Sequence, residues 1–305
     1  MNFVGQQGHY GLWRLACAVP AMLTSAVQVA IVCALLGRYA IVGLLVWLSV
    51  GFVLLARRAE RAAVRAVYRF REPAGSDAQW LASLQAWAEH RCEVRPGRLD
   101  WYVRDDPQPN AFAAGRCSVA VTTGFLQLLH TGRLGHDEAV AVVIHEIGHH
   151  ATGATRYGLL AEWLCWPWRV TYRTVMRLGG AMPYAEAGML LLPVIFVIAI
   201  VQTAQLDAPA EQLVPVLALL ATLAMGIFVA PVLDAVFARA SERAADRYTT
   251  QRGAGPDLAA ALHQVGPCQP SGLLGRLHHT HPATSARLTR LAGTAATAGR
   301  SPRPA

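Results

Sequence analysis

Two histidines and a glutamate follow the apolar run of residues 139–144, in the segment VIHEIGHHA at 143–151. On a helix His145 and His149 lie one turn apart on the same face, so their imidazole nitrogens can bind one divalent ion. Glu146 lies one step round the helix and can reach a water molecule bound to that ion. A buried glutamate without a metal or a partner is costly, which favours function over a structural role. The pattern predicts a zinc site with Glu146 as general base.

A catalytic zinc ion needs a third protein ligand and an open coordination position. The segment SERAAD at 241–246 follows a long apolar stretch, and on a helix its two acidic residues share a face. Glu242 could then bind the ion, while Asp246 could accept a hydrogen bond from a ligating imidazole. The alternative is a solvated charged turn paired with neighbouring arginines. The HExxH motif formed by His145, Glu146 and His149 favours the interpretation of Glu242 as a metal ligand.

The composition indicates a membrane protein. Apolar residues make up 54% of the 305-residue chain and charged residues only 15%, with a mean hydropathy of +0.32. A helix that crosses a bilayer needs about 20 apolar residues. Four stretches meet that length approximately and predict four spans, at 15–36, 40–56, 188–206 and 213–233.

The orientation follows from the basic residues, all of which are arginine. Six arginines lie at 57–71 after the second span, three lie at 239–247 after the fourth, and the loop DAPAEQ between the third and fourth has none. Arginine-rich flanks favour the cytoplasmic side, so 57–187 and 234–305 are expected there, although Arg38 in the first loop opposes this. The net charge of +8 is thereby explained by topology, and no nucleic acid is expected as a partner.

The cytoplasmic segments contain the elements that must position the motif. We expect residues 57–72 to continue the second span as a helix, and Ser76 to cap a following helix that extends to about His90, with Gln79 completing a capping box. Strand character appears at 99–103 and 118–122, and residues 137–151 indicate a buried helix. Residues 159–178 predict a helix that lies at the membrane surface or packs on the domain.

Several blocks resemble one known family. HEIGH, followed after two apolar spans by ASERAAD, resembles the HtpX-type membrane metallopeptidases, relatives of the CAAX prenyl proteases. PNAFA at 109–113, VAVTTGFLQLL at 119–129 and THPATSARLTRL at 280–291 are similar to that family's blocks, in the same order. The resemblance covers roughly residues 10–292. It implies a mainly α fold with a small β-sheet, a four-span helical membrane protein carrying a gluzincin-like zinc peptidase domain.

The resemblance also implies residue roles. His145, His149 and Glu242 would bind one Zn²⁺ per chain, Glu146 would be the general base, and Asp246 would support a histidine ligand. Asn110 would contact the substrate backbone, His281 would bind substrate or stabilise the oxyanion, and Arg287 would lie at the substrate site. His278 and His279 precede His281, so the imidazole that enters the site stays open, although Pro282 favours His281. The family's usual aromatic residue after the third ligand is missing, which affects only local packing.

The expected organisation has five parts: a membrane hairpin at 1–56, a catalytic region with the HExxH helix at 57–187, a second hairpin at 188–233, a catalytic region with the third ligand at 234–292, and a disordered tail at 293–305. The expected activity is a membrane-bound zinc endopeptidase acting on proteins or peptides, in quality control or peptide processing, in the plasma or inner membrane of a bacterium. A zinc-protease-like sensor and a non-catalytic scaffold are the alternatives. Cleavage within the bilayer is rejected, because the apolar run before the motif is too short for a span. The sequence specifies neither the substrate nor the oligomeric state.

Overall fold

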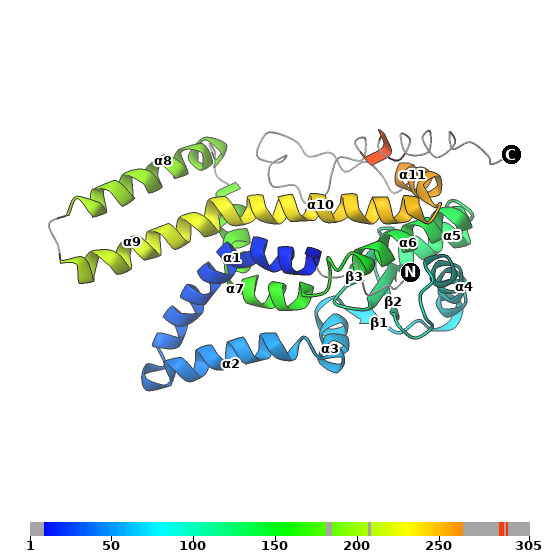
Figure 1. The fold of residues 1–305 in the computed structure, drawn as a ribbon, viewed down its shortest axis with the longest axis horizontal. Coiled ribbons are helices and arrows are strands. Elements are labelled where there is room, and N and C mark those ends of the chain that lie inside the picture. The colour runs from blue at the N-terminus through cyan, green and yellow to red at the C-terminus, as the bar shows by residue number, and fades with distance from the viewer. Residues whose placement is uncertain (1–8, 181–184, 207–208, 265–286, 290, 292–305) are drawn as a thin grey trace. The chain divides into compact units, whose positions relative to one another are not determined.

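Residues 9–180, 185–206, 209–264, 287–289 and 291 are described by a computed structural model of the chain (Figure 1). This part of the chain is mostly helical and contains one small sheet, as predicted. It divides into two compact units. The first, which we call the sheet unit, comprises the described residues of Met1–Arg14, Leu54–Leu159 and Ala235–Ala305. The second, the helical unit, comprises Leu15–Val53 and Leu160–Asp234. The expected tail at 293–305 lies outside the described residues.

The elements follow one another along the chain as α1 (His9–Ala34), the 3₁₀ helix η1 (Gly37–Tyr39), α2 (Ala40–Val53), α3 (Arg57–Val67), β1 (Phe70–Arg71), α4 (Gly75–Cys92), β2 (Asp100–Arg104), β3 (Ala111–Ala114), β4 (Ser118–Thr122), α5 (Thr123–His130), α6 (His136–Ala151), α7 (Gly158–Gly180), α8 (Ala185–Ala204), α9 (Ala210–Ala224), the π-helical turn η2 (Met225–Val229), α10 (Ala230–Gln251) and α11 (Gly255–Gln264).

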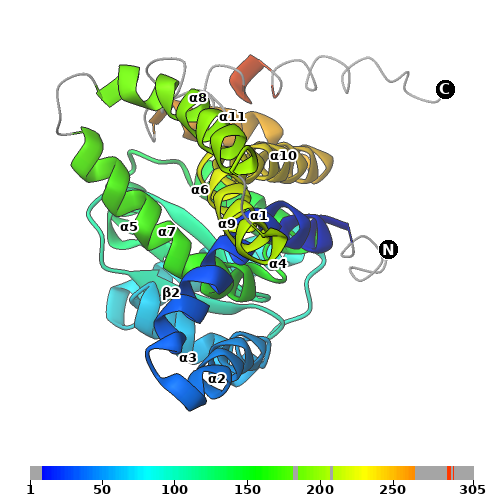
Figure 2. The same cartoon turned by 90° about the vertical axis from the view of Figure 1, so that its left-hand side faces the viewer.

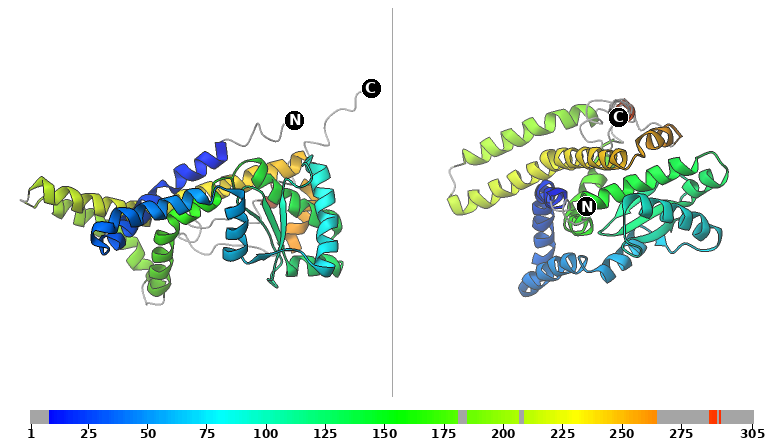
Figure 3. Two further views of the ribbon diagram at one scale, coloured as in Figure 1. Left: turned by 90° about the horizontal axis from the view of Figure 1, so that it is seen from below. Right: turned by 45° about the vertical axis from the view of Figure 1, so that its right-hand side comes forward.

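The sheet has the strand order β1-β2-β4-β3, in which β2 and β4 are parallel and the other pairs antiparallel. Successive residues of β2 face opposite sides. Trp101 and Val103 join the main core with α4, α6 and α11, whereas Tyr102 packs in a second cluster with Val64 of α3. Helices therefore cover both faces, and the left view of Figure 3 shows α3 and α4 on opposite sides of the strands.

Helix α6 is the buried centre of the sheet unit. Ten of its residues are buried, and it packs against α4, α11 and β3. Its start is fixed by Glu138, whose carboxylate accepts a hydrogen bond of 2.9 Å from the Gly135 N–H. The structure thereby confirms the helix predicted at 137–151. It likewise confirms the strands predicted at 99–103 and 118–122, to within one residue.

Two local predictions are wrong. Residues 57–72 do not continue α2, because the helix is interrupted at residues 54–56 and α3 begins anew at Arg57, with Val64 and Glu60 buried against the sheet. Packing of this amphipathic face outweighs continuation of the helix. The predicted cap at Ser76 with Gln79 is also wrong, since α4 begins at Gly75 after Ala74 and lacks a side-chain cap. The helix predicted at 159–178 is present as α7.

The helical unit packs small residues against one large ring. Ala18, Ala161 and Cys165 surround the buried Trp168. The Trp168 indole Nε1–H donates to the Gly226 carbonyl at 3.1 Å, in the π-helical turn η2, which satisfies a polar group that the core encloses. Helices α8 and α9 form an antiparallel hairpin, seen from two sides in Figures 1 and 2.

Among the described residues, two helical stretches are long and apolar enough to cross a membrane, His9–Ala34 and Ala210–Gln251. A third span results if the bent pair of Gly37–Val53 and Arg57–Val67 counts as one. Leu191–Ala204 is a shorter apolar helix. The four-span arrangement therefore stays a prediction.

Candidate metal centre

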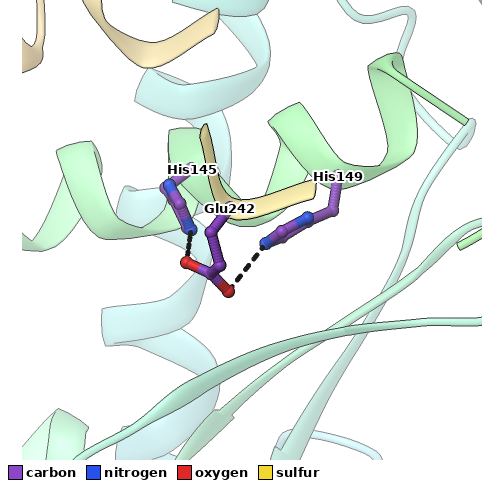
Figure 4. Close-up of side chains that lie close together, drawn as sticks. All are labelled: His145, His149 and Glu242. Atoms are coloured by element: carbon purple, nitrogen blue, oxygen red, sulfur yellow. Dashed lines mark ion pairs between the residues drawn. The ribbon is translucent and has the colours of Figure 1, made fainter. Parts of the chain in front are cut away.

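The two histidines of the motif lie on one face of α6, as their spacing predicts. The rings of His145 and His149 are 4.9 Å apart between centroids and nearly perpendicular. His145 is buried, with 4% of its surface exposed, and His149 is partly buried. Both rings point toward α10, where Glu242 lies between them (Figure 4).

Glu242 contacts both imidazoles through its two carboxylate oxygens. Its Oε2 lies 3.3 Å from His145 Nε2, and its Oε1 lies 3.6 Å from His149 Nε2. One nitrogen of each ring and one carboxylate oxygen all lie within 4.8 Å of one another. The structure thus brings together the three residues that the sequence proposed as ligands.

The two helices can approach this closely because Gly148 of α6 lies against the backbone of α10. A Cβ atom added at Gly148 would lie 3.2 Å from the Ala245 Cα and 3.3 Å from its carbonyl oxygen. These separations are at the lower limit for contacts of a real side chain. Gly148 follows the first ligand by three residues, and Ala245 follows the third ligand by three. The same turn of each helix therefore supplies both the ligands and the close contact.

Each histidine has a second partner from α10. Asp246 Oδ1 lies 3.2 Å from His145 Nδ1, on the opposite side of the ring from Glu242. The Ser241 hydroxyl lies 2.9 Å from His149 Nδ1. Both contacts leave the Nε2 atoms directed at Glu242 and so fix the rings in a ligating orientation. The sequence analysis proposed Asp246 but missed Ser241, although Ser241 directly precedes the proposed ligand.

Arg287 is enclosed within the site. Its guanidinium donates to both carboxylate oxygens of Asp246, at 2.6 and 3.2 Å, and Nη1 lies 3.3 Å from Glu242 Oε2. Only 9% of its surface is exposed. The described geometry therefore gives Arg287 the role of orienting and neutralising two carboxylates. Its predicted contact with substrate stays a prediction.

Burial and charge shift the proton affinities of the groups on α6. Burial alone would lower the pKa of His145, but the adjacent Asp246 and Glu242 carboxylates raise it to about 9. Burial raises the pKa of Glu146 above its usual range. A carboxylate with a raised pKa is a stronger base, which suits a group that takes a proton near neutral pH.

The residues present fit a zinc ion. Two imidazole nitrogens and a carboxylate oxygen are the ligand types of catalytic zinc sites. With bond lengths of about 2.0–2.1 Å, tetrahedral ligand atoms are about 3.3 Å apart. Each carboxylate oxygen of Glu242 is near that distance from one ring, at 3.3 Å for Oε2 and His145 and 3.6 Å for Oε1 and His149.

The remaining predicted site residues are less closely linked to this centre. Asn110 is exposed and directly precedes β3, an edge strand that packs beside α6. Its backbone is held by Thr122, whose hydroxyl accepts from the Asn110 N–H at 2.9 Å. His281, with its neighbours His278 and His279, lies outside the described residues.

The chain is similar to several known proteins. The model of "Peptidase family M48" matches residues 94–295. A "Protease HtpX" from Psychrobacter sp. is 38% identical over 86 residues, or 27% of this chain and 26% of that protein. A "Protease HtpX homolog" from Caldanaerobacter subterraneus is 42% identical over 52 residues, or 16% of each chain. These matches therefore span about a quarter or less of the curated relatives. The crystal structure of S. mikatae Ste24p aligns over 86% of this chain and 64% of that one, with 17% identity and a TM-score of 0.43.

Proposed function

Since the chain belongs to peptidase family M48, matched over residues 94–295, we propose that it is a membrane-bound, zinc-dependent endopeptidase. The observation that carries the proposal is the convergence of His145 and His149 on α6 with Glu242 on α10. These residues come from distant segments, and together they offer the donor set of a gluzincin site. His145, His149 and Glu242 would hold one Zn²⁺.

When bound, zinc supplies a Lewis acid that polarises a water molecule and the scissile carbonyl. The protein's own groups account for the proton transfers and the geometry. Glu146 accepts a proton from the attacking water and passes it to the departing amine, for which its raised pKa is suited. Ser241 and Asp246 keep the imidazoles in position. Arg287 offsets the negative charge of Asp246 and Glu242.

The substrate is proposed to be an extended segment of a protein or peptide. β3 is an edge strand next to α6, so it can pair with an added strand through its free backbone groups. Asn110, directly before β3, is proposed to bind the substrate backbone, with His281 stabilising the oxyanion. Membrane-protein quality control and processing of a specific peptide both fit this chemistry.

The proposed topology places four spans at 15–36, 40–56, 188–206 and 213–233, with both catalytic segments, 57–187 and 234–292, in the cytoplasm of a bacterium. It is supported by the apolar helices α1, α2, α8 and α9 and by the arginines beside them. Cysteine-labelling from each side of the membrane tests it. Labelling of a cysteine placed in 57–187 from the outer side of intact cells would refute it.

The activity is tested with the full chain purified in detergent. Bound metal is measured, and cleavage of an unfolded protein is compared between the wild type and Glu146→Gln. The matched control is Glu72→Gln, which removes the charge of a glutamate whose side chain is 71% exposed in the same unit. We expect one zinc per chain in all three proteins and loss of cleavage only in Glu146→Gln.

Equal cleavage by Glu146→Gln would refute the peptidase assignment. Stoichiometric zinc without cleavage by the wild type would favour the alternative of a zinc-binding sensor or scaffold. Full zinc affinity in Glu242→Ala would show that the third ligand is assigned wrongly.

A further inference from the structure

A cavity of about 260 Å³ lies in the sheet unit, and none of the proposed metal ligands lines it. Its wall comes from the start of α3, the chain before β2, the turn between β3 and β4, and the chain after α6. The residues that line it include four arginines, Arg57, Arg98, Arg116 and Arg156, and one carboxylate, Glu60. None of these residues belongs to the proposed zinc site.

Three of the arginines are not neutralised. Within the described part of the chain, Arg98, Arg116 and Arg156 form no ion pair with a carboxylate. Arg116 donates to the Leu55 carbonyl at 3.1 Å, and Arg156 lies over the ring of Tyr157. All three are exposed. Their guanidinium groups therefore leave a net positive charge at the cavity.

The acidic residue that lines the cavity, Glu60, forms hydrogen bonds with backbone N–H groups. Glu60 is almost completely buried, with 1% exposed, and its Oε1 accepts from the Arg116 and Cys117 N–H groups at 2.8 and 3.3 Å. A Cβ atom at Gly115 would come within 2.5 Å of the same oxygen, and Gly115 has a positive φ of 58°. Glu60 thus holds the turn that presents Arg116, and its hydrogen bonds are already supplied by that turn.

The floor of the cavity is uncharged. His150 Nε2 lies 3.1 Å from the Ser118 carbonyl, which can only accept, so this nitrogen carries the proton. His150 Nδ1 then accepts from the Thr155 hydroxyl at 2.9 Å. Both ring nitrogens are satisfied in the neutral form, so the positive charge belongs to the arginines at the rim.

The cavity also lies close along the chain to an apolar helix. The last two residues of α2, Phe52 and Val53, are 62% and 59% exposed. Arg57, which lines the cavity, follows four residues later, and Arg116 bonds to Leu55 in between. Arg57 is itself oriented by Asp100, at 3.1 Å. Apolar side chains that face lipid would therefore be followed directly by guanidinium groups at headgroup depth.

We propose that this cavity binds the phosphate group of an anionic phospholipid, in the leaflet where α2 ends. Guanidinium groups form paired hydrogen bonds with phosphate oxygens, and basic pockets beside apolar helices bind anionic headgroups. The cavity is smaller than the roughly 300–1,000 Å³ of pockets for drug-sized ligands, which agrees with a headgroup whose acyl chains stay outside.

The test is a lipid titration of the full chain in detergent, followed by native mass spectrometry. Phosphatidylglycerol is compared with phosphatidylcholine of the same acyl chains. We expect one tightly bound phosphatidylglycerol per chain. Phosphatidylcholine should bind with an affinity at least about tenfold lower. Arg98→Gln/Arg156→Gln is expected to lower the phosphatidylglycerol affinity by about tenfold or more. The matched control, Arg58→Gln/Arg95→Gln, changes two exposed arginines that do not line the cavity and is expected to bind as the wild type does.

Equal binding of the two lipids, or an equal loss in both double variants, would overturn the proposal. Inorganic phosphate is added in a separate arm, and complete displacement of the lipid by about 10 mM phosphate would identify a site for soluble anions instead. If the Arg98→Gln/Arg156→Gln variant unfolds, the salt dependence of lipid binding by the wild type tests the proposal instead. Its phosphatidylglycerol affinity must fall as salt rises, since exposed charges are screened over about 10 Å at 0.1 M salt, and an affinity independent of salt would contradict the proposal.

Discussion

Replacement of Ser241 by alanine tests whether α10 orients the metal ligands as the structure indicates. The Ser241 hydroxyl lies 2.9 Å from His149 Nδ1 and is 6% exposed. Without it, the Nδ1 atom of the partly buried His149 ring loses its partner, which costs at most about 1–3 kcal/mol. Loss of a group that supports a ligating histidine typically lowers metal affinity about 10–100-fold, or about 1.4–2.7 kcal/mol. The gain in helix propensity from serine to alanine is at most about 0.5 kcal/mol, so the predicted sign is clear.

The assay is a zinc titration of the metal-free protein against a competing chelator. Ser83→Ala is the matched control, because the Ser83 hydroxyl contacts His136 Nε2 at 3.1 Å, on the same helix α6 but away from the metal centre. We expect Ser241→Ala to bind zinc at least tenfold more weakly, and Ser83→Ala to bind it as the wild type does. Zinc binding by Ser241→Ala within about twofold of the wild type would refute the role assigned to this hydroxyl.

Two further predictions concern α6. Gly148→Ala adds a Cβ atom 3.2 Å from Ala245, so we expect overpacking to destabilise the fold by about 1–3 kcal/mol and to weaken zinc binding, as thermal unfolding and zinc titration can measure. The control is Gly135→Ala, where the nearest atom is 3.5 Å away. Because Gly135 caps α6, this change is expected to cost under about 1 kcal/mol and to leave zinc binding unchanged. The pKa of His145 is raised from 6.5 to about 9, so in the metal-free protein this group stabilises the fold fully below pH 6.5, and the contribution is lost as the pH rises through about 9. Zinc binds the neutral ring, so the affinity for zinc should rise with pH up to about 9. Binding at about pH 7 should also release a proton, which calorimetry in buffers of different ionisation enthalpy can measure. An affinity that is flat from pH 6 to 8 would contradict this protonation state.

Hydrophobic periodicity predicts the elements whose own residues determine them. The apolar run before His145 gives the buried α6, and alternating β-branched residues give β4. β3 was missed because its sequence, AFAA, has little strand propensity of its own. It becomes a strand because Ala111 and Ala113 pair with Val121 and Val119 of β4. The substrate edge proposed here therefore depends on a pairing that no local pattern reveals.

The break after α2 was missed for a similar reason. The arginine-rich residues 57–67 form a good helix in isolation, and continuation of α2 is the simplest expectation. The structure interrupts the helix at residues 54–56 and packs α3 against the sheet, where buried Glu60 bonds to the turn before β4, some 55 residues further along the chain. No local pattern reveals such a long-range contact, although the helical character of the segment was predicted correctly.

The metal centre shows which part of a site a motif can specify. Spacing alone places His145 and His149 on one face, and it places Glu242 and Asp246 on another. That these faces meet depends on Gly148, because a side chain there would press on the backbone of residue 245 at 3.2 and 3.3 Å and hold α6 away from α10. The glycine embedded in the HEIGH motif is therefore as necessary to the site as its ligands, because it lets two segments distant in sequence come close enough to share one ion.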